Sequence, residues 1–232
     1  MDKKVDKKGV LAVIDGVDGS GKGTHTAMLV DRLQKEGRDV VMMDFPRYGM
    51  PSALFIERYL RGEMGTADEV GPYRASVYYA EDRADAAPLI KAALARGAIV
   101  LCNRYVSSNM GHQAGKIADR VERERFLLWL KEYEYEVRGI PMPDINILLY
   151  VTPEMGQLLV DNKSARAYTQ GMKRDIHEAD IEHLRHSSGA YLEVARKENW
   201  KIISLMNGDD ALRDKADVHE EIYEFLKATK AI

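Results

Sequence analysis

The sequence predicts an α/β fold of three layers, in which helices cover both faces of a five-stranded parallel sheet. Five short runs are almost continuously apolar, as expected of strands that are buried on both faces of such a sheet. Longer helical patterns separate these runs, so successive strands are predicted to be joined by crossover helices. A glycine-rich loop follows the first run and precedes a helix, which is the context of a phosphate-binding loop.

The predicted strands are rich in β-branched residues. They span Val10–Ile14, Val40–Met43, Ala98–Cys102, Ile145–Val151 and Ile202–Met206. The predicted helices cover Thr24–Lys35, Pro51–Leu60, Pro72–Arg96, Ala118–Arg138, Pro153–Val160, Glu178–Asn199 and Lys215–Lys227. Gly37 and Gly97 stand at the ends of two of these helices, where a glycine is common. In sheets of this kind ligands bind beyond the carboxyl ends of the strands, so we expect the functional residues there.

Length and composition narrow the class of protein. The 232 residues suffice for one domain with a full core, and we expect a flexible tail over residues 1–8 and a single domain over 9–232. The net charge of −3, with both signs mixed, gives no indication of a nucleic-acid or membrane partner. Cys102 is the only cysteine, which fits a reducing compartment. No apolar run approaches membrane-spanning length and the first residues lack the apolar core of a signal peptide, so we expect a cytoplasmic protein.

The glycine-rich loop carries the most specific motif, Gly-x4-Gly-Lys, within Ile14–Thr24. Its glycines allow backbone amides to converge on an anion, and the dipole of the following helix adds to the attraction. Lys22 supplies a mobile charge for the outer phosphates. The predicted ATP-binding residues are therefore Gly16, Val17, Asp18, Gly19, Ser20, Gly21, Lys22, Gly23 and Thr24.

Other candidates follow the second and third strands. The stretch Asp44-Phe-Pro-Arg47 fits an ordinary turn as well as a binding site, because proline commonly marks loops. Arg104 stands at the end of a buried strand, where its charge must find an anion or several acceptors. We therefore expect Arg104 to face the same cleft as Lys22. The stretch Ser108–Gln113, which comes next, is rich in short hydrogen-bonding groups.

Two further segments have two interpretations each. Tyr79 and Arg83 share one face of a predicted helix. They are either a core tyrosine beside a surface salt bridge, or an aromatic plate and a guanidinium that read a planar base. The polar, basic stretch at about 161–178 is either a solvated loop or a mobile lid that closes over a triphosphate.

Together these pieces resemble the thymidylate kinases, a family of P-loop nucleoside monophosphate kinases. The resemblance rests on Gly-Val-Asp18-Gly-Ser-Gly-Lys22, Phe45-Pro-Arg47, Asp-Arg83 and Arg104-Tyr-x-x-Ser108. Asp18 distinguishes the chain from adenylate kinases, which are similar in the glycine loop but lack this acid. The resemblance implies a P-loop kinase fold with a mobile lid, and phosphorylation of dTMP to dTDP by ATP and Mg²⁺ for dTTP synthesis. It also implies a homodimer.

The resemblance further implies roles for single residues. Asp18 is expected near the substrate's sugar and the metal, with Thr24 as a second metal-binding candidate. Arg47 and Arg104 are expected to hold the acceptor phosphate. The other expected substrate contacts are Phe45, Pro46, Tyr79, Arg83, Ser108, Asn109, His112 and Gln113. Because the glycine loop has no basic residue except Lys22, the catalytic arginine is expected from the lid, as Arg166 or Arg174 with Lys173 assisting. The expected catalytic residues are Asp18, Lys22, Arg104, Arg166 and Arg174.

The chain departs from the family pattern at three positions. Asn103 stands where the family usually has aspartate, which removes a negative charge beside the metal. Gly23 lacks the hydroxyl usually offered to magnesium, and His112 replaces a tyrosine or phenylalanine that crowds the sugar 2′ position. A kinase for dUMP, dCMP or UMP, and a catalytically weak nucleotide-binding protein, therefore stay open as alternatives.

The histidines and the cysteine do not indicate a zinc enzyme. His177, His183 and His186 lie close together in the sequence, but no His-Glu-x-x-His motif or cysteine pair accompanies them. They are expected to be solvated helix histidines.

In the helix Ala118–Arg138, periodicity predicts core positions at Val121, Phe126, Leu130, Tyr133 and Val137.

Overall fold

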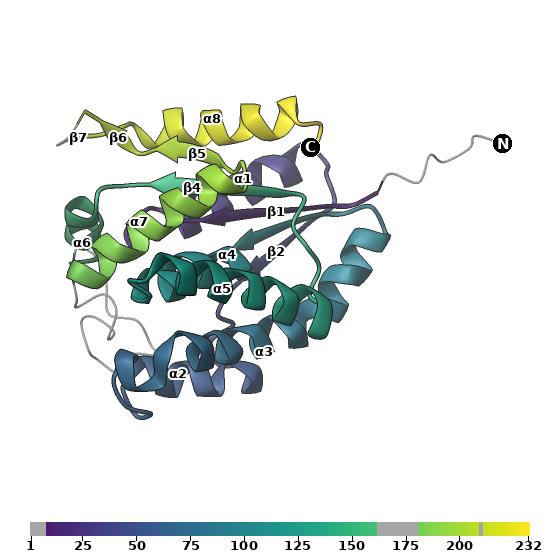
Figure 1. Cartoon of the computed structure of the whole chain (residues 1–232). Coiled ribbons are helices and arrows are strands. Elements are labelled where there is room, and N and C mark those ends of the chain that lie inside the picture. The colour runs from purple at the N-terminus through teal and green to yellow at the C-terminus, as the bar shows by residue number, and fades with distance from the viewer. Residues whose placement is uncertain (1–7, 162–180, 209–210) are drawn as a thin grey trace.

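The centre of the molecule is a five-stranded parallel sheet, seen in a computed structural model that describes residues 8–161, 181–208 and 211–232 (Figure 1). The strand order is β2-β3-β1-β4-β5. The strands are β1 (Val10–Asp15), β2 (Val40–Asp44), β3 (Ile99–Asn103), β4 (Ile145–Tyr150) and β5 (Lys201–Ser204). All five predicted strands are confirmed, with their ends displaced by at most two residues.

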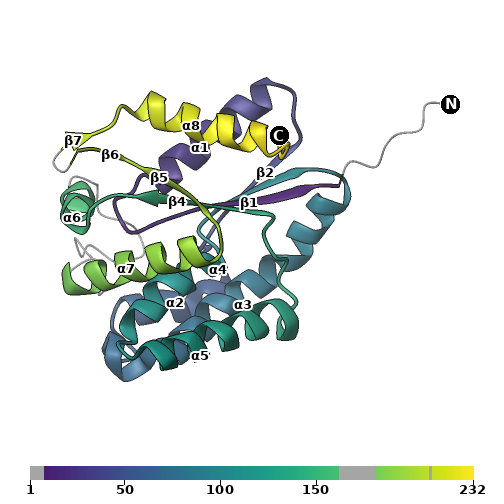
Figure 2. The same ribbon diagram turned by 45° about the horizontal axis from the view of Figure 1, so that its top comes forward.

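Helices cover both faces of this sheet, which confirms the predicted three layers. Helices α1 (Lys22–Lys35) and α8 (Lys215–Ala228) lie on one face (Figures 1 and 2). Helices α3 (Ala67–Ala95), α5 (Arg120–Lys131) and α7 (Ile181–Lys197) lie on the other. The alternation of side chains along β1 explains the two cores, because successive residues point to opposite faces. The buried clusters accordingly place Leu11 and Val13 with α3 and α5, and Ala12 and Ile14 with α1 and α8.

Helix α3 begins earlier than predicted and contains a break. Thr66 caps it through a reciprocal pair of hydrogen bonds with Glu69. Gly71 then leaves the helical region, with φ 73° and ψ 164°, and Pro72 starts the long regular part. The predicted start at Pro72 is therefore the start of the second, longer helical piece. Before α3, the 3₁₀ turn η1 (Pro51–Ala53) leads into α2 (Leu54–Leu60).

The helix predicted at Ala118–Arg138 consists of α5 followed by a π-helical segment, η4 (Glu132–Val137). Phe126 and Leu130 are fully buried, as predicted. Val121 and Val137 are not core residues, because 58% and 66% of their surfaces are exposed. The wider π turn shifts the periodicity, so Glu134 rather than an apolar residue faces the interior.

The remaining elements follow strands β3, β4 and β5 along the chain. After β3 come α4 (Val106–Ser108), the π-helical η2 (Asn109–Gln113) and the 3₁₀ turn η3 (Ala114–Lys116). Helix α6 (Pro153–Asp161) follows β4, and β6 (Met206–Asn207) pairs with β7 (Ala211–Leu212) in a hairpin. Most of the predicted tail (residues 1–8) and of the predicted lid (about 161–178) lies outside the described residues. The division into a tail and a single domain stays a prediction.

The two histidines of α7, His183 and His186, differ in burial. His183 on α7 is buried, with 9% of its surface exposed, so the expectation of a solvated histidine is wrong at this position. The reason is that α7 packs its inner face on η2 and η3, where His183 stacks near His112.

Across the described parts of the chain, no helix combines the length and apolarity needed to cross a membrane.

Candidate active site

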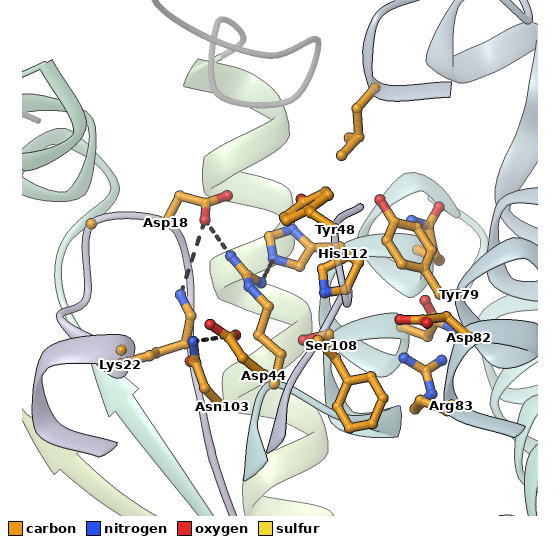
Figure 3. A pocket seen from close by; sticks show the side chains of 18 of the residues that line it. Asp18, Lys22, Asp44, Tyr48, Tyr79, Asp82, Arg83, Asn103, Ser108 and His112 are labelled. Atoms are coloured by element: carbon orange, nitrogen blue, oxygen red, sulfur yellow. Dashed lines mark hydrogen bonds and ion pairs between the residues drawn. The ribbon is translucent and has the colours of Figure 1, made fainter. Parts of the chain in front are cut away.

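A cavity of about 480 Å³ opens at the carboxyl ends of the strands (Figure 3). Four segments meet there: the glycine loop after β1, the end of β2, the middle of α3, and the chain from the end of β3 through η2. The predicted site residues that line it are Asp18, Gly19, Gly21, Lys22, Gly23, Phe45, Pro46, Tyr79, Arg83, Arg104, Ser108, Asn109, His112 and Gln113. The fold thus brings most of the predicted site into one cavity.

The glycine loop is folded tightly against α6. Gly19 has φ 83°, and a Cβ added there would lie 2.1 Å from the carbonyl oxygen of Gly156. A side chain therefore cannot occupy this position without moving α6. Lys22 opens α1 and is buried, with its Nζ donating to the carbonyl of Val17 at 2.8 Å and lying 4.0 Å from Asp18. Its ammonium group accordingly points along the inside of the loop (Figure 3).

Four predicted ATP-binding residues do not line the cavity. Gly16 and Val17 pack into the protein, since a Cβ on Gly16 would meet the Leu149 carbonyl at 2.3 Å and Val17 is 3% exposed. Ser20 is fully buried, with no hydrogen-bond partner for its hydroxyl among the described residues. Thr24 is exposed on α1. Because Thr24 does not line the cavity, its expected role at the metal stays a prediction.

Arg104 lines the cavity together with Lys22, as its strand-end position predicted. Its backbone has φ 64°, a conformation that non-glycine residues adopt rarely and often at functional sites. The Nη2 atom donates to Oδ1 of Asp18, and Nη1 lies 3.0 Å from Nε2 of His112. Because a guanidinium only donates, the Nε2 of His112 accepts and this histidine is neutral. Burial, and secondarily the charge of Arg104, lowers the pKa of His112 well below 6.5.

Arg47 does not line the cavity, unlike the other residues expected to contact the substrate. Its side chain turns to α3, where Nε donates to Asp82 at 3.0 Å and Nη2 donates to Asp85 at 2.5 Å. Nη2 also donates to the hydroxyl of Ser52 at 2.8 Å. Arg47 is therefore not among the residues that line the cavity, and its expected contact with the acceptor phosphate stays a prediction. The buried carboxylate of Asp82 explains the difference, since it requires a cationic partner.

Arg83 and Tyr79 both line the cavity from α3 (Figure 3). Arg83 is 1% exposed, so the surface salt bridge considered for it is wrong. Its Nε and Nη2 donate to the two carboxylate oxygens of Glu134 at 2.7 and 2.5 Å, and Nη1 donates to the carbonyl of Tyr105 at 3.1 Å. Asn109 also donates to Glu134, at 2.9 Å. Glu134 thus fixes two of the predicted substrate-binding side chains at once.

The hydroxyl of Ser108 is engaged behind the cavity wall. It donates to the carboxylate of Asp15 at 2.8 Å, as do Ser107 at 2.6 Å and Tyr191 at 2.8 Å. Asp15 is fully buried at the end of β1. This carboxylate therefore ties the segment after β3 and helix α7 to the strand that carries the glycine loop.

Asp44 lines the cavity, although the sequence analysis assigned it no role. It pairs in register with Asn103 across β2 and β3, and the Nδ2 of Asn103 donates to its Oδ1 at 2.7 Å. Burial raises the pKa of Asp44, and Asn103, Arg104 and Lys22 partly oppose this rise. The sequence contains a signal for this position, because Asp44 directly follows the predicted strand Val40–Met43. It therefore lies at the ligand-binding edge of the sheet. Glu134 gave no such signal, because it lies in a stretch that alternates glutamate with tyrosine.

Comparison with known proteins identifies the family. A sequence profile of the family described as thymidylate kinase matches residues 14–222. The thymidylate kinase of Mycobacterium tuberculosis is 33% identical over 204 residues, which cover 87% of this chain and 92% of that protein. The chain belongs to the thymidylate kinase family. The resemblance found in the sequence is thereby confirmed.

Two further relatives of this family cover nearly the whole chain. The thymidylate kinase of Halothermothrix orenii is 30% identical over 225 residues, which are 95% of this chain and 97% of that protein. The solved structure of a thymidylate kinase from Candida albicans superimposes with a TM-score of 0.74, covering 97% of this chain and 93% of that one. At 18% identity this last likeness confirms the fold alone. Family membership makes the chain a P-loop kinase, which transfers a phosphoryl group from ATP.

Proposed function

We propose that this chain transfers the terminal phosphoryl group of ATP to dTMP and so forms dTDP and ADP. One observation carries the proposal. A single cavity joins Lys22 and the glycine loop to Tyr79, Arg83, Asn109 and further groups of α3 and η2. A phosphate-binding loop thus faces groups suited to a planar base across one space. A phosphoryl transfer requires this arrangement, because donor and acceptor must meet in line.

The donor half of the cavity is the glycine loop. The amides of the loop and of the first turn of α1 supply hydrogen bonds to the outer phosphates of ATP, and Lys22 supplies a positive charge. Gly19 and Gly21, with φ 83° and 73°, give the loop a backbone that other residues rarely adopt. The predicted ATP contacts at Gly16, Val17 and Ser20 act in this account by supporting the loop from behind.

The acceptor half lies under α3 and η2. Arg104 is the cation best placed for the acceptor phosphate, because its guanidinium lines the cavity beside the glycine loop. Tyr79 supplies an aromatic face for the base, and Arg83, with Asn109 and Gln113, supplies donors along its edge. Phe45 and Pro46 form an apolar border to the phosphate position. His112, as a neutral acceptor, holds Arg104 in place.

Magnesium fits the groups present in the cavity. Asp18 and Asp44 supply carboxylates, and the Oδ1 of Asn103 is a buried acceptor without a hydrogen-bond partner in the described structure. In the described residues no three His, Cys, Asp or Glu side chains form a metal cluster, which agrees with an ion that is held mainly by substrate phosphates and water. When bound with ATP, the ion would neutralise negative charge on the phosphates. Asp18 would contribute to holding it.

The chemistry needs positioning more than it needs a base. The acceptor phosphate is already an anion at neutral pH, since its second pKa is about 6. Lys22 and Arg104 bring the two anions together and stabilise the charge of the transferring group. Arg166 and Arg174, with Lys173, are proposed to add charge from the lid and to exclude water, although these residues lie outside the described structure.

The setting of the enzyme is also proposed. A cytoplasmic site of action agrees with the single, buried cysteine, Cys102, whose pKa is raised by burial. A homodimer agrees with large apolar side chains exposed on two of the helices that cover one face of the sheet. These are Leu89 on α3 and Val121 and Leu128 on α5, with 58 to 70% of their surfaces exposed. Light scattering on the purified chain measures this directly, and a monomer mass at 50 µM would reject the dimer.

The activity is tested by coupled ADP release with ATP and Mg²⁺ across dTMP, dUMP, dCMP and UMP. The account predicts the highest kcat/KM with dTMP. A higher value with UMP or dCMP would replace dTMP as the substrate. ATP binding without ADP release from any monophosphate would instead support a catalytically weak nucleotide-binding protein.

A further inference from the structure

The glycine loop and its neighbouring strand lack two groups that commonly hold magnesium in P-loop enzymes. Those groups are a hydroxyl directly after the loop lysine and an aspartate at the end of an adjacent strand. Here Gly23 follows Lys22, and Asn103 ends β3. The two positions are close together, since a Cβ added to Gly23 would lie 3.5 Å from the Nδ2 of Asn103. The chain therefore offers a neutral amide at this point and no charge.

A carboxylate stands one strand further on. Asp44 ends β2 and pairs with Asn103 in register. The Nδ2 of Asn103 donates to the Oδ1 of Asp44 at 2.7 Å, so the amide beside Gly23 also contacts this carboxylate (Figure 3). Asp44 is exposed to the cavity, and both Lys22 and Arg104 are near enough to oppose the rise in its pKa. The missing negative charge is thus present at the next strand end.

Three carboxylates line the cavity, and their partners differ. Asp18 accepts from Arg104, and Asp82 accepts from the Nε and the backbone amide of Arg47. Within the described residues, Asp44 accepts a hydrogen bond from the neutral amide of Asn103 alone, and it makes no ion pair within 4 Å there. Of the three, it is the one without an ion pair within the described residues, so its charge is available to a cation that arrives with a nucleotide.

We propose that Asp44 supplies, besides Asp18, an anionic contact to the magnesium of the bound nucleotide, with Asn103 as the bridge that positions it. The proposal deepens the proposed function and rests on it, since the ion arrives with ATP. Mg²⁺ keeps several of its waters in such sites, so Asp44 and the unpartnered Oδ1 of Asn103 can act by accepting hydrogen bonds from that hydration shell. The usual aspartate is thus replaced by an amide and a carboxylate on neighbouring strands.

The test measures nucleotide affinity and does not depend on turnover. Calorimetry gives the Kd of ADP with 5 mM Mg²⁺ and with EDTA, and the ratio of the two is the gain in affinity due to the metal. Asp44→Asn should reduce this gain about 10-fold, the scale seen when a group that orients metal ligands is lost. Its metal-free Kd should stay equal or become lower, because a negative charge near the phosphates has been removed.

Asp39→Asn is the matched control. It removes the same charge just before the other end of β2, where Asp39 pairs with Arg96 on the surface. This variant should keep the wild-type gain. Asn103→Asp in the Asp44→Asn background should restore at least a third of the lost gain, because it returns the carboxylate to the adjacent strand end.

The possible results separate this proposal from the proposed function. If Asp44→Asn keeps the gain within twofold while wild type binds ADP, the role of Asp44 is overturned and the kinase function stands. If Asp39→Asn loses the gain equally, a general charge effect explains the result and the proposal also falls. Wild-type protein that binds no ADP with or without Mg²⁺ would overturn the proposed function and this inference together.

Discussion

Arg104 donates a hydrogen bond to the carboxylate of Asp18 across the cavity. The pairing joins the end of β3 to the glycine loop, and it occupies the guanidinium that we propose for the acceptor phosphate. Asp18 is the nearest acid to that guanidinium and holds the pKa of Arg104 well above its usual value against the effect of burial. A monophosphate that binds at Arg104 must therefore replace or share the bond to Asp18.

This relationship predicts opposite effects on binding and on turnover. Asp18→Asn removes the competing charge, so dTMP should bind about 5-fold more tightly, which corresponds to about 1 kcal/mol for a partly solvated pair. The same variant should lower kcat at least 100-fold, because Asp18 is proposed to help hold the metal. Calorimetry with dTMP and steady-state kinetics measure the two effects separately. Weaker dTMP binding in Asp18→Asn would mean that Asp18 holds the substrate and does not compete with it.

Glu134 and Arg83 form a buried pair that should govern base recognition. Glu134→Gln keeps an acceptor for Arg83 but removes the charge that positions it. We expect the Kd of dTMP to rise about 5- to 10-fold, and the Kd of ATP to stay within twofold, because the pair lies in the acceptor half. Arg83→Ala should show the same selectivity, with a loss of unfolding free energy of about 3–5 kcal/mol from the unpaired buried Glu134. Equal losses of dTMP and ATP affinity in the Glu134→Gln variant would refute the role in base recognition.

Arg47 is predicted to stabilise the fold through Asp82. The side chain of Asp82 is 1% exposed, so Arg47→Ala leaves a buried carboxylate without its cation. We expect a loss of about 1–3 kcal/mol in the free energy of unfolding, measured with urea. Asp85→Ala is the control, because Asp85 is 59% exposed and its pair with Arg47 is worth at most about 1 kcal/mol. Equal losses in the two variants would show that the pair with Asp82 stabilises the fold no more than the pair with Asp85 does.

His25 on α1 predicts a dependence of stability on pH. Burial and the nearby His219 lower the pKa of His25 from 6.5 to about 4 in the folded protein. Between these values the unfolded chain binds a proton that the folded chain does not, so stability falls as the pH drops below about 6.5. At pH 5 the loss amounts to about 2 kcal/mol.

The measurement is urea unfolding of wild type and His25→Gln at pH 7 and pH 5. The glutamine variant should lose about 2 kcal/mol less than wild type over this interval, because it has no group that titrates at this position. The same loss in both proteins would mean that His25 is protonated in the folded state or stays neutral in both states.

The fold could be predicted from the sequence because the strands are buried on both faces. Such strands read as continuous apolar runs, and glycines after Lys35 and Arg96 mark the helix ends. Periodicity failed in the first turn of α5, where Val121 is exposed, and where the backbone changes its period. The π turn at Glu132–Val137 places Val137 in solvent and Glu134 in the core. A regular helix would place these two residues differently, and nothing in the local composition announces the change.

The site was predictable where a charged residue follows the end of a buried strand, directly or after a glycine-rich loop, as at Arg104 and Lys22. The partners of these residues were not, because they come from elements distant in the sequence. Arg47 and Asp82 are 35 positions apart, and Arg83 and Glu134 are 51 positions apart. A buried arginine demands a carboxylate, but the sequence does not say which one.

The central claim is that one cavity holds the phosphates of two nucleotides between Lys22 and Arg104. The most direct measurement is calorimetry with adenosine and thymidine joined through five phosphates, followed by competition with ATP and with dTMP. The account predicts one ligand per chain, an affinity at least 10-fold above that of either nucleotide, and displacement by both. An affinity no better than that of ATP alone, or dTMP binding undiminished in the presence of the joined ligand, would contradict it.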